Sequence, residues 1–190
     1  VLERVSYSNI SLVDNVLNKK NDVHLDLSSI AKGYAVDFIV LKLIELGYND
    51  FLVDIGGELS CNGNNNNNNW IVGIAHPNEN EIFLKTIIND FSIATSGTYN
   101  NYTIYEDKEY SHLINPITGY PIMNSVVSAT VLSENCITSD AIATMLMVLP
   151  YDKGLDIVNG MDNVECMILI NKDDDILKLE SFNFKDRVVD

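Results

Sequence analysis

Asp26-Leu-Ser-Ser-Ile-Ala-Lys-Gly-Tyr-Ala-Val-Asp37 combines possible helix-capping residues with apolar side chains at helical spacing. Asp26 or Ser28 is a suitable N-cap, and the apolar positions that follow share one helical face: Ile30, Tyr34, Phe38 and Leu41. Gly47 stands where a C′ residue ends such a helix. The strand-like run 51–55 comes next. This part of the chain therefore predicts a helix, a tight loop and a strand.

Outward from this unit, strand-like runs outnumber helical ones. Residues 126–132 form a strongly apolar, β-branched run, and residues 165–170 and 176–179 read as a closing hairpin. Residues 136–149 read as a second helix with Asp140 in its first turn, and Pro150 lies beyond its end. The elements do not alternate as βαβ units. We therefore expect an α+β fold with a mixed, mostly antiparallel sheet and two main helices.

Residues 64–69 are six consecutive asparagines, an unusual run for a folded domain. Asparagine favours turns, and such a tract cannot bury apolar surface. We expect a surface loop between two strands of a hairpin, without a functional role. Residues 1–190 otherwise read as a single domain.

The composition restricts the partners. The chain carries 27 acidic and 12 basic residues, a formal net charge of −15, which argues against nucleic acid or anionic lipid as a partner. An anionic ligand would need a helix N-terminus, a lysine or a metal ion to offset this charge. The cysteines, at 61, 136 and 166, show neither zinc-site nor disulfide spacing and are expected to be buried thiols. No apolar run is long enough for a transmembrane helix.

The segment Thr138-Ser-Asp-Ala-Ile-Ala-Thr144 offers oxygen ligands on a helix. Asp140 and Thr144 are four residues apart, so a carboxylate and a hydroxyl share one face. Such a pair suits Mg²⁺ or Ca²⁺, which prefer oxygen. The alternative is that Asp140 only complements the helix dipole while Thr144 packs.

Lys32 lies in the first turn of the earlier helix, an unfavourable place for a cation unless an anion is nearby. Together with free backbone N–H groups, it could bind a pyrophosphate. Ser28 and Ser29 could equally be simple caps.

Three shorter motifs lie between these two helices. Gly56-Gly57 and Thr95-Ser96-Gly97 each follow a strand, where glycine permits either close approach of a ligand or a tight turn. His112 precedes Asn115-Pro116 at the end of a polar hairpin and could act as a general base or be a structural histidine.

Taken in order, these motifs resemble those of the FAD:protein FMN transferase (ApbE) family. The matching pieces are Asp26-Leu-Ser-Ser-Ile-Ala-Lys-Gly-Tyr-Ala-Val-Asp37, Leu52-Val-Asp-Ile-Gly-Gly-Glu58, Ile93-Ala-Thr-Ser-Gly-Thr-Tyr99, Tyr110-Ser-His-Leu-Ile-Asn-Pro-Ile-Thr-Gly119 and Thr138-Ser-Asp-Ala-Ile-Ala-Thr144. The resemblance implies an ApbE-like fold and a Mg²⁺-dependent enzyme that splits FAD. It would transfer FMN to a threonine or serine hydroxyl of an acceptor flavoprotein, a subunit of a redox complex, and release AMP.

The resemblance also implies roles for individual residues. Asp140, Thr144 and the main-chain carbonyl of Ser29 would be metal ligands. Asp26, Lys32 and Ile114 would contact FAD, and His112 would be the base that acts on the acceptor hydroxyl. The pocket would be lined by Thr95, Ser96 and Gly97.

Family members carry a further N-terminal segment that supplies part of the FAD pocket. Because the signature helix begins within thirty residues of Val1, we expect the chain to be truncated at its N-terminus. The family is exported and often lipid-anchored, which implies a membrane-associated lipoprotein. The alternatives are a protein that binds or hydrolyses FAD without modifying an acceptor, and a catalytically silent binding module.

Overall fold

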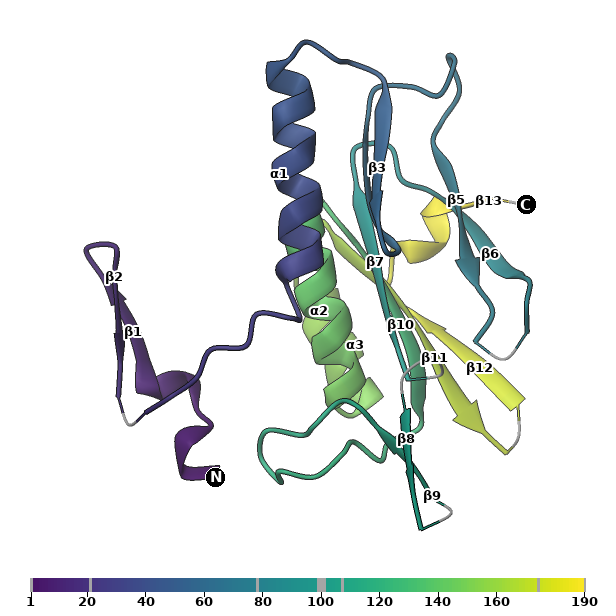
Figure 1. The fold of residues 1–190 in the computed structure, drawn as a ribbon. Helices are drawn as coiled ribbons and strands as arrows, with labels where there is room; N and C mark the ends of the chain where they lie inside the picture. The colour runs from purple at the N-terminus through teal and green to yellow at the C-terminus, as the bar shows by residue number, and fades with distance from the viewer. Residues whose placement is uncertain are drawn as a thin grey trace.

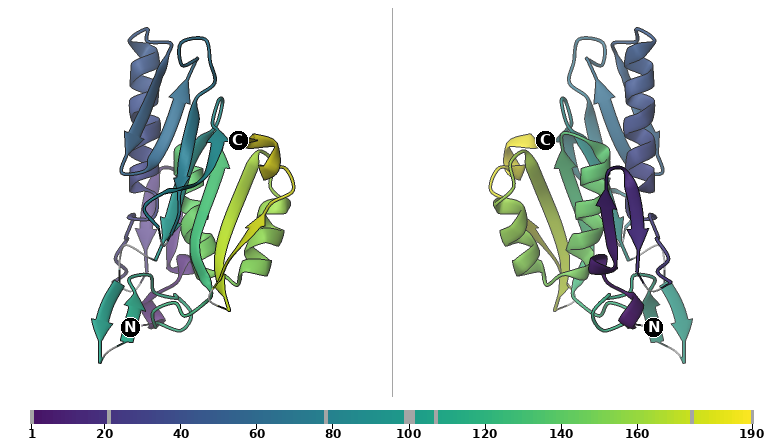
Figure 2. Two further views of the ribbon diagram at one scale, coloured as in Figure 1. Left: turned by 90° about the vertical axis from the view of Figure 1, so that its right-hand side faces the viewer. Right: turned by 90° about the vertical axis from the view of Figure 1, so that its left-hand side faces the viewer.

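The computed structural model describes residues 2–20, 22–77, 79–98, 102–106, 108–173 and 175–189. Its main body has three layers, with helices on one face of a six-stranded sheet and a smaller sheet on the other (Figures 1 and 2). The large sheet is antiparallel throughout, in the order β12-β11-β10-β7-β4-β3. The expectation of an α+β fold with a mostly antiparallel sheet is confirmed.

The six strands of the large sheet follow one another along the chain as β3 (Phe51–Ile55), β4 (Glu58–Asn62), β7 (Ser92–Gly97), β10 (Val126–Ser133), β11 (Val164–Lys172) and β12 (Asp175–Glu180). The helices are α1 (Ala31–Glu45), α2 (Cys136–Val148) and the shorter α3 (Tyr151–Asn159). α1 packs against β3 and β4, α2 against β7 and β10, and α3 against β11. The two main helices of the sequence prediction are thus present, and the closing hairpin is β11–β12.

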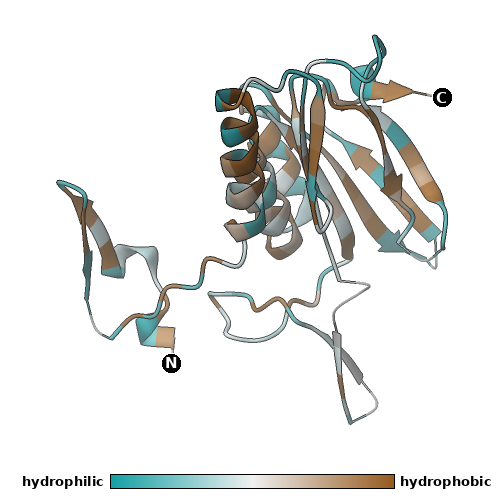
Figure 3. Cartoon of the chain, turned by 45° about the horizontal axis from the view of Figure 1, so that its top comes forward, coloured by the Kyte–Doolittle hydropathy of each residue, from teal (hydrophilic) through white to brown (hydrophobic). Residues whose placement is uncertain are grey.

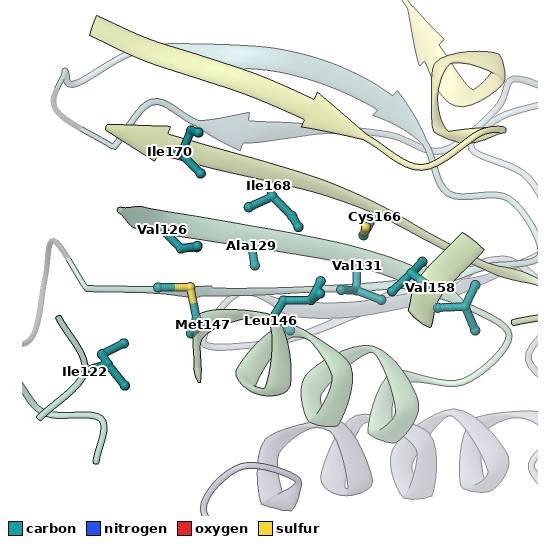
Figure 4. Close-up of a cluster of buried hydrophobic side chains, with 12 residues drawn as sticks. Ile122, Val126, Ala129, Val131, Leu146, Met147, Val158, Cys166, Ile168 and Ile170 are labelled. Carbon is teal, nitrogen blue, oxygen red and sulfur yellow. The ribbon is translucent and has the colours of Figure 1, made fainter. Parts of the chain in front are cut away.

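Strands β10 and β11 are buried on both faces, which explains their nearly continuous apolar sequence. Ala129, Val131 and Ile168 face α2 and α3 (Figure 4), whereas Leu132 and Met167 face the smaller sheet. Alternate side chains of an extended strand point to opposite faces, so each strand contributes to two cores. Burial of an apolar side chain contributes about 1.5–3 kcal/mol, so these two strands anchor the layers.

Helix α1 begins later than the sequence suggests. Its N-cap is Ile30, which makes no side-chain cap hydrogen bond, and Asp26 instead accepts the backbone N–H of Ser28 (2.9 Å) ahead of the helix. The prediction that Asp26 or Ser28 caps the helix is therefore wrong. Gly47, with φ of +87°, ends the helix as expected. Much of the outer face of α1 is apolar and exposed (Figure 3), including Tyr34 and Leu41.

The asparagine run lies on the surface, but it does not close a hairpin. It joins β4 of the large sheet to β5 (Ile71–Ala75) of the smaller sheet, whose order is β13-β6-β5. The other strands of that sheet are β6 (Ile82–Ile87) and β13 (Val188–Val189). The predicted surface loop is present and the predicted hairpin is wrong, because both strands find better partners elsewhere.

Two small hairpins complete the fold. β1 (Ile10–Val13) pairs with β2 (Val16–Lys19), and this unit lies apart from the main body in Figure 1. β8 (Tyr102–Tyr105) pairs with β9 (Lys108–Ser111), as the sequence predicts, although Asp107 at its centre is outside the described residues. Three short 3₁₀ turns cover Leu2–Arg4, Tyr7–Asn9 and Phe184–Arg187. Within the described part of the chain, no helix is long and apolar enough to cross a membrane.

Candidate functional site

A cavity of about 480 Å³ opens where the start of α1, the middle of α2, the end of β7 and the segment after β9 meet. Every predicted site residue lines it, together with Ser28 and Leu113. The lining residues are Asp26, Ser28, Ser29, Lys32, Thr95, Ser96, Gly97, His112, Leu113, Ile114, Asp140 and Thr144. The fold thus brings together motifs that are more than 100 residues apart in the sequence.

Asp140 is held by α1. The backbone N–H of Gly33 donates to Asp140 Oδ2 (2.9 Å), and Asp140 is only 4% exposed. It is the fifth residue of α2, just past the first turn, so the predicted position in the first turn is wrong. Burial raises the pKa of the Asp140 carboxyl, while the Gly33 N–H and the Lys32 ammonium oppose this rise. With Oδ2 engaged, Oδ1 is the oxygen that remains for a cation.

Two further features set the position of α2 against α1. The Asp37 carboxylate accepts the first two backbone N–H groups of α2, those of Cys136 (2.8 Å) and Ile137 (2.9 Å). These groups have no partner inside the helix, so a carboxylate from a neighbouring helix satisfies them and complements the helix dipole. A Cβ atom on Gly33 would lie 2.5 Å from the Cys136 carbonyl oxygen, so only glycine permits this approach.

The Ser29 carbonyl and the Thr144 hydroxyl are the other oxygens expected as ligands. If α1 began one residue earlier, the Gly33 N–H would donate to the Ser29 carbonyl, but here it donates to Asp140. The first hydrogen bond of the helical pattern is the one that the Tyr34 N–H donates to the Ile30 carbonyl (2.9 Å). Thr144 Oγ1 lies 3.3 Å from Ser96 Oγ. Ser29, Asp140 and Thr144 therefore border one cavity with hard oxygen donors.

Lys32 lines the same cavity from the first turn of α1. Its Nζ contacts Glu58 Oε1 (2.5 Å), and the Lys32 side chain is 48% exposed while that of Glu58 is 2% exposed. Burial raises the pKa of Glu58, and Lys32 lowers it. Lys32 is the positive group among the residues that line this cavity.

The remaining walls come from β7 and from the segment after β9. Thr95 Oγ1 lies 2.9 Å from Thr130 Oγ1, which fixes the Thr95 hydroxyl against β10. His112 lies just beyond β9 and is exposed, and Ile114 is 51% exposed. The Leu113 carbonyl accepts the Ile122 N–H (2.9 Å), so this segment is tied to the following turn.

The structure also separates some motifs from the cavity. Gly56 and Gly57 form the tight turn between β3 and β4, with φ of +65° and +98°, and line a different cavity of about 560 Å³. Cys136 and Cys166 are buried, as expected, whereas Cys61 is only partly buried, and burial raises the pKa of Cys166 to about 12. Among the described residues, no cluster of three or more His, Cys, Asp or Glu side chains could hold a metal ion.

Sequence reasoning assigned no role to Asp37 and Glu58. Both fall inside motifs quoted above, Asp37 at the end of the first and Glu58 directly after Gly56-Gly57. The one signal in the sequence was that each carboxylate stands among apolar residues that are expected to be buried. An acidic residue in such a place usually has a specific partner.

Comparison with known proteins identifies the family of this chain. The profile of the ApbE family matches residues 1–168. The FAD:protein FMN transferase of Vibrio cholerae is 36% identical over 180 residues, which cover 93% of this chain and 54% of that protein. The enzyme of the same name from Haemophilus influenzae is 35% identical over 167 residues, or 86% of this chain and 48% of that protein. The chain thus spans about half the length of these curated relatives.

Solved structures show the same fold. The flavin transferase ApbE from Vibrio cholerae superposes with a TM-score of 0.85 at 33% identity, covering 98% of this chain and 60% of that one. The ApbE protein of Thermotoga maritima superposes with a TM-score of 0.89 at 26% identity, covering all of this chain and 62% of that one. The extent of the profile match, the identities and the shared fold establish that this chain belongs to the ApbE family.

Proposed function

We propose that the protein transfers FMN from FAD to a threonine or serine hydroxyl of an acceptor flavoprotein and releases AMP, with Mg²⁺ bound in the cavity. Family membership supports the reaction class. The single observation that carries the proposal is the convergence of all the predicted site residues on one cavity. This cavity combines hydrogen-bonding groups, a lysine and a buried carboxylate, as binding of a nucleotide pyrophosphate requires.

The donor set fits Mg²⁺. Asp140, Thr144 and the Ser29 carbonyl offer one carboxylate and two neutral oxygens, and Mg²⁺ keeps several waters and needs few protein ligands. Burial of Asp140 without a cation is unfavourable, as its raised pKa indicates. Bound there, the ion would offset the charge of the pyrophosphate and of the leaving AMP. Such a cation would also reduce the repulsion between an anionic ligand and a chain with a net charge of −15.

The chain's own residues divide the remaining tasks. Lys32 binds a phosphate oxygen, and Asp26 hydrogen-bonds a hydroxyl or ring N–H of FAD. The backbone at Ile114 and the residues Thr95 to Gly97 orient the flavin nucleotide. His112 Nδ1 or Nε2 takes the proton of the acceptor hydroxyl while the oxygen of this hydroxyl forms a bond to the FMN phosphorus. The bond between this phosphorus and the bridging pyrophosphate oxygen breaks, and AMP leaves with the electron pair.

The proposal is tested by incubating the protein with FAD, Mg²⁺ and a flavoprotein subunit of a redox complex. We expect the acceptor to gain the mass of one FMN moiety while AMP appears in equal amount, by mass spectrometry and chromatography. Free FMN and AMP without an adduct would establish an FAD-hydrolysing enzyme instead. FAD binding without turnover would establish a binding module.

A further inference from the structure

Glu58 is a buried carboxylate that lies behind the cavity without lining it. It is the first residue of β4, directly after the Gly56-Gly57 turn, and its side chain is 2% exposed. One oxygen, Oε1, contacts Lys32 Nζ (2.5 Å), whereas the other, Oε2, is buried without a hydrogen-bond partner in the described part of the chain. A buried, half-satisfied carboxylate is unfavourable for folding, so its presence needs a reason beyond stability.

The exposure of the two partners indicates which one holds the other. Lys32 is 48% exposed and reaches the cavity, whereas Glu58 is fixed on a strand inside the protein. A lysine side chain has four rotatable bonds and loses much conformational freedom when it binds a ligand. A buried anchor removes part of that freedom in advance, which favours binding.

A second anion competes for the Lys32 ammonium. Asp140 and Lys32 line the same cavity, and the N–H of Gly33, the residue after Lys32, donates to Asp140 Oδ2 (2.9 Å), so the two charged side chains belong to adjoining parts of the cavity wall. If Lys32 were not held elsewhere, its ammonium would be attracted to Asp140 and would compete there with a cation. The contact with Glu58 prevents this.

We propose that Glu58 is a positioning residue that holds the Lys32 ammonium at the cavity wall and away from Asp140. Lys32 is then available for an anionic group of the ligand, and Asp140 for a divalent cation. This inference deepens the proposed function and rests on it for the identity of ligand and cation. It adds a part of the site that lies outside the cavity lining.

The test compares Glu58→Gln with the unmodified chain in two measurements that need no turnover. Crystal structures locate Lys32 Nζ, and titration with Mn²⁺ followed by electron paramagnetic resonance gives the cation affinity. We expect Nζ to turn toward Asp140 in the variant and Mn²⁺ to bind about ten-fold more weakly, as for other partners that support a metal ligand. The control is Glu45→Gln, which breaks the exposed Lys42–Glu45 pair on α1, the helix that carries Lys32. This control should change neither the position of Lys32 Nζ nor the Mn²⁺ affinity.

A double-mutant cycle separates positioning from direct attraction between Glu58 and the cation. In a Lys32→Met background, Glu58→Gln should change Mn²⁺ affinity by less than about two-fold, because its effect passes through Lys32. An equal loss in both backgrounds, or an unmoved Nζ in Glu58→Gln, would overturn the proposal. If Glu58→Gln does not fold, Glu58→Leu replaces it, since the Lys32 ammonium that it leaves unpaired belongs to a half-exposed side chain and can be hydrated.

These outcomes are independent of the proposed function. The absence of an FMN adduct on any acceptor would refute the transferase without affecting the position of Lys32. If the unmodified chain bound no Mn²⁺, the crystallographic comparison alone would decide the role of Glu58.

Discussion

The two sides of the cavity are built in different ways. On the helical side, Asp140 is 4% exposed and is held by the Gly33 N–H, while Asp37 ties the start of α2 to α1. On the opposite side, His112 and Ile114 are exposed and follow a small hairpin that lies outside the large sheet. The helical side is therefore held by contacts within the protein, whereas the side chains of the hairpin side are exposed to solvent. We expect substitutions on the helical side to affect both fold and chemistry, and those on the hairpin side to affect chemistry alone.

The largest effect is expected at Asp140, on the helical side. If Mg²⁺ binds as proposed, Asp140→Asn should lower FAD turnover about a thousand-fold, because the ion would supply several kcal/mol of charge stabilisation. The variant should fold, since an amide oxygen can still accept the Gly33 N–H. Turnover is followed by AMP release during Mg²⁺ titration, and unchanged Mg²⁺ stimulation would remove Asp140 from the site.

The same variant should change how stability depends on pH. Burial raises the folded-state pKa of Asp140 above its unfolded value, so the native state binds this proton more tightly. Its contribution to stability is therefore fully present below the unfolded pKa and is lost as pH rises through the folded pKa. In thermal melts without metal, Asp140→Asn should be at least as stable as the unmodified chain at mildly alkaline pH.

On the hairpin side, His112→Ala should affect transfer but not folding. We expect transfer to the acceptor to fall about a hundred-fold, the usual contribution of a general base, while FAD affinity and melting temperature stay unchanged. Mass spectrometry of the acceptor and fluorescence titration of FAD give the two readings. His24→Ala is the control, because His24 is exposed and lies outside the cavity lining. Normal transfer by His112→Ala would exclude it as the base.

Two glycines test how rigid the helical side is. Gly33→Ala would bring a Cβ atom to 2.5 Å from the Cys136 carbonyl oxygen, so α1 and α2 must separate. We expect a loss of about 3 kcal/mol in the free energy of unfolding, the upper range for overpacking, together with lower turnover. Gly154→Ala is the matched control with a smaller expected loss, since its Cβ would meet a side-chain methyl group of Leu146 (2.6 Å) and no backbone atom. Equal losses in urea unfolding of both variants would contradict the α1–α2 junction as a special contact.

The elements of the fold and the two hairpins β8–β9 and β11–β12 followed from local patterns, but the pairing of strands that are distant in the sequence did not. The run 126–132 predicted a buried strand because β10 is covered on both faces, and helical spacing predicted α1 and α2. The expected hairpin around the asparagine run failed because β4 and β5 join different sheets. No local pattern encodes which distant strands pair, since that choice depends on contacts between residues far apart in the sequence.

The site followed from the sequence in a similar way. Residues whose functional groups reach the cavity, such as Lys32 and His112, could be proposed from motifs and from family resemblance. Asp37 and Glu58 could not, because their partners lie on other elements, at a sequence separation of 99 residues between Asp37 and Cys136. The supporting residues of the cavity therefore become visible only when the helices are packed together.

A smaller effect is expected at Asp37, which supports the helical side without lining the cavity. Asp37→Asn keeps one acceptor but turns an amide NH₂ toward an N–H group of α2 and removes the charge at the helix start. We expect a loss of about 1 kcal/mol, as for other changes at helix N-caps, with turnover reduced less than by Asp140→Asn. Urea unfolding and AMP release measure the two effects. A loss of turnover without any loss of stability would show that Asp37 acts on the ligand rather than on the helix.

The smallest effect is expected in the asparagine run, which belongs to neither side of the cavity. Asn66 and Asn67 have φ of +51° and +64°, and Asn65 and Asn68 bridge around them, so the run forms a tight turn of its own. Glycine adopts these angles without strain, and Asn67→Gly should change the free energy of unfolding by less than about 0.5 kcal/mol. FAD turnover should equal that of the unmodified chain, because residues 64–69 are exposed and outside the cavity lining. A change in turnover at unchanged stability would give the asparagine run a role in binding, beside the helical side and the hairpin side of the cavity.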